Sequence, residues 1–89
     1  MLIALIGRDK PGALQTRLDN RDAHVAYLKE SGAVSQAGPL LDEAGQMCGS
    51  LVILDLPDMD AARAWVDGDP YGKAGLFGSV ELVPWNKVI

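Results

Sequence analysis

The chain has 89 residues and a mass of 9.5 kDa, which is enough for one domain and too little for two. Its 8 basic and 12 acidic side chains give a net charge of −4, which argues against a nucleic-acid-binding surface, because such a surface is basic. A single cysteine and a single histidine exclude an internal disulfide and a zinc ligand set. The sequence implies no other metal or cofactor, so we expect none. The longest apolar run, Leu2–Ile6, is too short for a membrane span or a secretion signal, so we expect a cytoplasmic protein.

The first third of the chain predicts a strand followed by a helix. Residues 2–6 are apolar at every position, which is typical of a strand. After a loop over residues 8–12 the spacing becomes helical, and we expect a helix from about Thr16 to Ser31, ended by Gly32. Thr16 with Asp19 fits a capping box, and Asp19 or Asn20 alternatively caps a later start. One side of this helix is apolar, at Leu14, Leu18, Val25 and Leu28.

The rest of the chain predicts two strands, a helix and a last strand. Pro57-Asp58 ends one strand and offers Asp58 as a helix cap, and Gly68-Asp69-Pro70 breaks the helix that follows. These elements are expected over Ala33–Leu41, Met47–Leu56, Met59–Asp67 and Leu76–Trp85. The resulting order, βαββαβ, is that of an α+β ferredoxin-like fold, with a four-stranded antiparallel sheet and both helices on one face. We expect one such domain over residues 1–89.

Two of the expected strands are apolar on both faces, which predicts a partner for the sheet. In the first strand Leu2, Ala4 and Ile6 form one apolar set, and Ile3 and Leu5 form the other. A monomeric ferredoxin-like sheet has one face in water and alternates apolar with polar residues. We therefore expect a homodimer in which two sheets pack face to face. A ligand or a different partner on the second sheet face is the alternative.

His24 and Arg21 lie on the first helix, close to its apolar side. His24 is either a solvated residue at the helix boundary or a general base, because histidine titrates near neutral pH. Arg21 falls within the apolar stripe, so its guanidinium must extend to solvent or point at a cavity or a carboxylate.

Asp69 and Tyr71 share the segment that follows the second helix. Asp69, followed by Pro70, fits the cap of a short helical turn, and its carboxylate is also able to orient an imidazole such as His24. Tyr71 either donates a hydrogen bond or packs at a boundary. Ser50 begins a strand without the surrounding motif of a nucleophilic serine.

Three short motifs together resemble the YciI-like (YCII-related) family. They are Arg21-x-x-His24, Ala37-Gly38-Pro39-Leu40 and Asp69-Pro70-Tyr71, in a chain that ends with Val83-Pro84-Trp85 and has similar spacing throughout. The resemblance implies a dimeric α+β barrel of ferredoxin-like subunits.

The resemblance also implies roles for particular residues. His24 and Asp69 match a catalytic pair proposed for the family, Arg21 matches the arginine before that histidine, and Ser50 matches a polar residue at the cleft. One branch of the family is linked to dehydrochlorination of chlorinated hydroxyquinones. We therefore expect acid–base chemistry, of elimination or isomerisation type, on a small anionic or phenolic compound. In this expectation His24 is the base, Asp69 orients it, and Arg21, Ser50 and Tyr71 bind the substrate. A non-catalytic module that binds a small ligand is the alternative.

Overall fold

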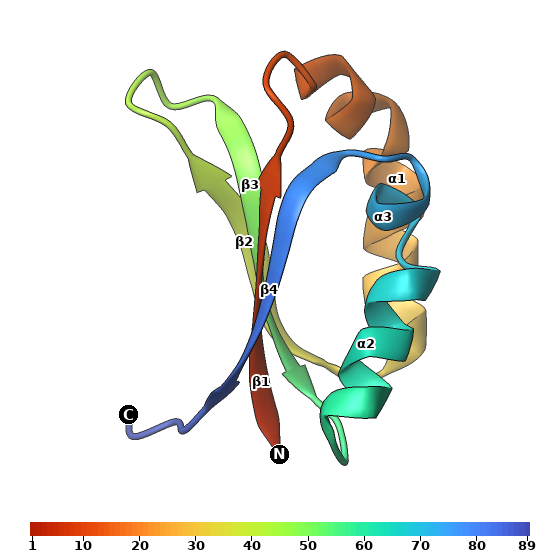
Figure 1. Ribbon diagram of the computed structural model, residues 1–89, viewed down its shortest axis with the longest axis vertical. Helices are drawn as coiled ribbons and strands as arrows, with labels where there is room; N and C mark the ends of the chain where they lie inside the picture. Colours follow the sequence, from red (N-terminus) through yellow and green to blue (C-terminus); the bar gives the residue numbers. More distant parts are fainter.

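The computed structural model describes all of residues 1–89 and shows one antiparallel sheet with helices on one of its faces (Figure 1). The strands lie side by side in the order β2-β3-β1-β4, so the first strand of the chain is central. The elements follow one another as β1 (Leu2–Asp9), α1 (Leu14–Ser31), β2 (Val34–Leu41), β3 (Met47–Asp55), α2 (Met59–Gly68), α3 (Pro70–Lys73) and β4 (Phe77–Trp85). This order confirms the predicted ferredoxin-like α+β fold, with α3 as a single additional turn.

The hydrophobic core lies between the sheet and the helices. Ile3 and Leu5 of β1 are fully buried there, together with Leu54 of β3 and with Ala62 and Trp65 of α2. Because side chains alternate along a strand, Ala4 and the other members of its set point to the opposite face. No helix lies over this opposite face, which we call the outer face (Figure 1).

The helix α1 begins at Leu14, earlier than the sequence predicted. Its cap position is Ala13, which makes no side-chain capping bond, so neither the capping box nor a cap at Asp19 or Asn20 forms. Instead the Asp19 carboxylate accepts a hydrogen bond from Gln15, and the Asn20 amide donates to the Thr16 carbonyl inside the helix. Gly12 adopts φ = 71°, a left-handed conformation that glycine tolerates, just before the helix. The chain therefore enters α1 at Leu14 and not at a later residue.

The inward side of α1 is polar in its first half, which also differs from the prediction. Leu18 was expected to be in the apolar stripe but is 47% exposed. The two buried residues of the helix are Arg17 and His24. One side of α1, between Arg17 and Leu28, lines a cavity, and this placement explains why Arg17 and His24 point inward.

The C-terminus of α1 and the N-terminus of α2 have the caps that the sequence predicts. Gly32 ends α1 in the left-handed conformation, at φ = 65°. The Asp58 carboxylate accepts a hydrogen bond from the Ala61 amide at 2.8 Å and so starts α2. None of the three helices combines the length and the hydropathy needed to cross a lipid bilayer.

Candidate active site

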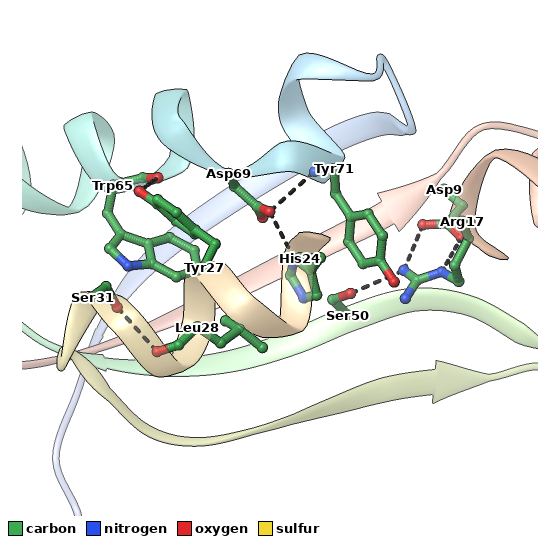
Figure 2. Close-up of polar contacts among 10 residues, drawn as sticks. All are labelled: Asp9, Arg17, His24, Tyr27, Leu28, Ser31, Ser50, Trp65, Asp69 and Tyr71. Atoms are coloured by element: carbon green, nitrogen blue, oxygen red, sulfur yellow. Dashed lines mark hydrogen bonds and ion pairs between the residues drawn. The ribbon is translucent and has the colours of Figure 1, made fainter. Parts of the chain in front are cut away.

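His24 and Asp69 meet across the helical layer, although 45 positions separate them in the chain. Nδ1 of His24 lies 2.7 Å from Oδ1 of Asp69, and both side chains are buried (Figure 2). The same Oδ1 atom accepts a hydrogen bond from the Tyr71 amide at 3.1 Å, which caps α3. The two interpretations of Asp69, as a helix cap and as the partner of an imidazole, therefore hold at once.

The hydrogen bond to Asp69 determines which nitrogen of His24 is available for chemistry. A carboxylate only accepts, so Nδ1 carries the proton and donates it to Asp69. The other nitrogen, Nε2, makes no hydrogen bond within the chain and is not sealed from the cavity that His24 lines. In the neutral imidazole this nitrogen bears a lone pair and is able to accept a proton.

Tyr71 packs flat against the imidazole. The two ring centroids lie 3.8 Å apart with an interplanar angle of 12°, and the Phe77 ring meets Tyr71 edge-on at 6.1 Å. Burial raises the pKa of the Tyr71 hydroxyl, and the positive charges of Arg17 and Arg21 only partly oppose this effect. The phenol therefore stays protonated at neutral pH, and its ring fixes the plane of the His24 side chain.

Arg17 is a functional candidate that the sequence did not single out. Its Nε and Nη2 atoms donate to the Asp9 carboxylate at 2.7 and 2.9 Å, and Nη2 also donates to the Ser50 hydroxyl at 2.9 Å (Figure 2). Burial alone lowers the pKa of Arg17, but the hydrogen bond and charge of Asp9 outweigh that effect and raise it. Arg17 precedes His24 by seven residues, which is about two helical turns, and this spacing was the available signal for a shared face.

Arg21 lies at the edge of the same cavity, which is one of the places that its sequence position allowed. It is exposed, makes no ion pair with a carboxylate, and lies in the wall of the cavity. The buried arginine that points at a carboxylate is Arg17, because it lies one turn nearer to Asp9 at the end of β1. The guanidinium of Arg17 also lies over the Tyr71 ring, 4.7 Å from its centroid.

These side chains converge on a cavity of about 160 Å³ between α1 and the strands β2 and β3, which we call the site cavity. Its polar lining comes from Arg17, Arg21, His24 and Ser50. Tyr71 and apolar side chains form much of the rest, and Asp69 lies behind His24. A buried cavity of about 150 Å³ is known to hold benzene, so the site cavity has room for one six-membered ring.

No group of three or more His, Cys, Asp or Glu side chains lies close enough to hold a metal ion. The polar groups of the site are instead two arginines, one hydroxyl and one imidazole with its carboxylate. This set is suited to binding an anion and to moving a proton.

A family model for the YCII-related domain matches residues 1–86. The chain belongs to the YCII-related family. Protein YciI of Escherichia coli is 37% identical over 97 residues, and the alignment covers 99% of both chains. An uncharacterised protein of Haemophilus influenzae is 36% identical over 98 residues with the same coverage. The resemblance inferred from the short motifs is thereby confirmed.

Two solved structures share the fold of this YCII-related protein. One is 5-chloro-2-hydroxyhydroquinone dehydrochlorinase (TftG) from Burkholderia phenoliruptrix, in complex with 2,5-dihydroxybenzoquinone. It superposes with a TM-score of 0.88 at 35% identity and covers 97% of this chain and 94% of its own. The other, a NIPSNAP domain protein from Burkholderia xenovorans, has a TM-score of 0.52 at 16% identity over 99% of this chain and 96% of its own, and it supports the fold alone.

Proposed function

We propose that this YCII-related protein is a small enzyme that uses His24 and Asp69 for acid–base chemistry, of elimination or isomerisation type, without a metal or cofactor. The observation that carries this proposal is the pair itself: Asp69 holds Nδ1 of His24 and leaves Nε2 facing the site cavity. Family membership and the structural similarity to a dehydrochlorinase support the same class of chemistry.

The proposed step is a proton transfer from the substrate to Nε2 of His24. The electron pair released from the broken bond moves into the conjugated system of the substrate and, in an elimination, expels the leaving group. His24 becomes an imidazolium in this step, and the Asp69 carboxylate stabilises that charge at Nδ1. The Tyr71 ring holds the imidazole in plane while the proton moves.

The arginines and Ser50 make the cavity suitable for an anionic or phenolic substrate. Arg17 uses Nε and Nη2 for Asp9 and Ser50, which leaves Nη1 without a hydrogen-bond partner in the chain. We propose that Nη1 of Arg17, the Arg21 side chain and the Ser50 hydroxyl hold the substrate oxygens, because a guanidinium binds an oxyanion through charge-assisted hydrogen bonds. The cavity volume accommodates one ring of such a substrate.

We further propose that residues 1–89 form one domain that works in the cytoplasm as a homodimer, with the outer faces of two sheets in contact. The outer face that no helix covers, with its exposed apolar side chains, supports this assembly. Light scattering is expected to give about twice the monomer mass of 9.5 kDa. A stable monomer at micromolar concentration contradicts it.

The test of the reaction is chloride release from 5-chloro-2-hydroxyhydroquinone by the purified protein. We expect turnover by the wild type and a loss of roughly 10²–10⁴-fold in His24→Gln, which is the usual contribution of a general base. Lys29→Gln, an exposed change on the same helix, is the matched control and is expected to keep full activity.

Ligand binding is measured in parallel, by calorimetry with 2,5-dihydroxybenzoquinone. We expect His24→Gln to retain binding, because the arginines and Ser50 remain in place. If the wild type binds this compound but releases no chloride, the result favours the non-catalytic module that binds a small ligand and contradicts the proposed chemistry.

A further inference from the structure

The strand β2 separates the site cavity from a second concave region on the outer face. Ala37, Gly38 and Pro39 line the site cavity and also line a hollow of about 410 Å³ on the other side of the sheet. Ala37 and Pro39 pair with Val52 and Ser50, which face the helical side, whereas Gly38 pairs with the outward-facing Leu51. At this point the wall of the site cavity is one strand thick.

This wall is held by its own chain along one edge only, where it pairs with β3. β2 is an edge strand, its residues 37–39 are exposed, and Figure 1 shows the β2–β3 hairpin bending away from the helices. A side chain built at Gly38 would meet nothing within 4 Å, so the outer side of the wall is open. Edge segments with few packed neighbours are the parts of a fold that move most easily.

The outer face is chemically suited to a second copy of itself. Large apolar side chains are exposed on it, among them Leu51, Val83 and Trp85, each between 37% and 39% exposed. The positive and negative charges on the outer face are equal in number. Arg8 and Glu81 carry opposite charges on the neighbouring strands β1 and β4. The Asp55 carboxylate lies 3.8 Å from the N-terminal ammonium. Although the whole chain carries a charge of −4, two copies of this face meet without net repulsion.

We propose that a second copy of the chain, packed into the outer hollow, fixes the position of Ala37–Pro39 and thereby completes the site cavity. Ligand binding in the cavity and dimerisation are then coupled. This inference rests on the proposed homodimer and on the proposed ligand site. By linkage, a ligand that binds the dimer more tightly than the monomer strengthens the dimer by the same factor for each ligand bound.

The first test needs no ligand. The Ala37 methyl group faces the site cavity, and its NMR signal is followed as the wild type is diluted until the dimer, monitored by light scattering, dissociates. We expect the Ala37 signal to shift along the dissociation curve, while that of Ala62, buried in the core under α2, stays in place. An unchanged Ala37 signal across dissociation overturns the coupling.

The second test compares two changes of an apolar side chain to lysine. Leu51→Lys places a charge in the outer hollow without touching the site cavity, and Val88→Lys, beyond the last strand, is the control. We expect Leu51→Lys to be a folded monomer by circular dichroism, with affinity for 2,5-dihydroxybenzoquinone weakened at least about 5-fold. Val88→Lys is expected to match the wild type.

The outcomes separate this inference from the proposals beneath it. Wild-type affinity in monomeric Leu51→Lys overturns the coupling and leaves the proposed chemistry intact. A wild type that is monomeric at every concentration overturns both the homodimer and the coupling. If the wild type does not bind the quinone, the proposed ligand class is wrong, and the Ala37 signal alone decides the coupling. The dilution experiment also decides it if Leu51→Lys fails to fold.

Discussion

At the scale of single residues, one oxygen atom links the candidate chemistry to the local fold. Oδ1 of Asp69 accepts from His24 Nδ1 and from the Tyr71 amide, so the residue that orients His24 also begins the turn that carries Tyr71. Tyr71 in turn stacks on His24. The three side chains therefore hold one another in place.

Two substitutions at Asp69 separate its two roles. Asp69→Asn keeps an oxygen that accepts from the Tyr71 amide but loses the charge that stabilises the imidazolium. We expect the free energy of unfolding to change by less than about 1 kcal/mol and turnover to fall by roughly 10²–10⁴-fold. Asp69→Ala also removes the cap and costs about 1 kcal/mol more in stability. Urea unfolding and turnover are measured on both variants, and full activity in Asp69→Asn contradicts a role in catalysis.

The sequence predicted part of this site and missed part. Family motifs indicated His24 and Asp69, which the structure brings together. Arg17 was missed because a buried arginine is recognisable only through its partners, and Asp9 and Ser50 lie on two other elements. Arg21, indicated by its angle on the helix and by the family motif, lines the same cavity but is exposed, because helical periodicity reports a face of the helix and not the depth of each residue.

At the scale of elements, strands and caps were easier to predict than the inward face of α1. Apolar runs and the Asp58 and Gly32 caps depend on local chemistry, so the sequence was sufficient for them. Leu18 was misplaced because the prediction assumed that every helix packs its apolar side on a core, whereas this part of α1 covers a cavity. Here tertiary structure outweighed the pattern.

Two glycines of the paired strands β2 and β3 give a matched test of close packing. A Cβ atom at Gly49 would lie 2.5 Å from the Gly7 carbonyl oxygen, whereas one at Gly38 meets nothing within 4 Å. Gly49→Ala is therefore expected to lower the free energy of unfolding by about 1–3 kcal/mol, as overpacking does. Gly38→Ala should stay within about 0.5 kcal/mol. Urea denaturation measures both, and equal effects contradict the close approach of β1 and β3.

At the scale of the whole molecule, the apolar patterning correctly predicted the sheet, but not which apolar set faces the helices. Of the two apolar sets in β1, the one made by Ile3 and Leu5 lies in the core. The other, made by Leu2, Ala4 and Ile6, faces outward. Both sets are equally apolar in sequence, so only the register of β1 against its neighbours decides between them.

Alkaline pH is expected to weaken the whole domain. Burial raises the pKa of both Tyr27 and Tyr71 above the ordinary value of 10.0, so the unfolded chain releases these protons first. The stability that the two phenols contribute is complete below that value and is lost as the pH rises towards their folded pKa values. Arg17 stays charged throughout, because its pKa is raised as well.

The measurement is urea unfolding between about pH 8 and about pH 11. Tyr71→Phe keeps the ring that stacks on His24 but cannot ionise, so its stability should fall less steeply with pH than that of the wild type. Identical slopes for the two proteins contradict a perturbed phenol at position 71.

The long separations between the partners of the site have a consequence for folding. His24 and Asp69 are 45 residues apart and Arg17 and Ser50 are 33 apart, so neither pair forms within a local segment. Closing such loops is entropically unfavourable until the sheet has assembled. A helix that forms early carries His24 without its carboxylate and Arg17 without its hydroxyl partner. Activity recovered during refolding therefore reports the completed topology, and it should trail the appearance of helical signal.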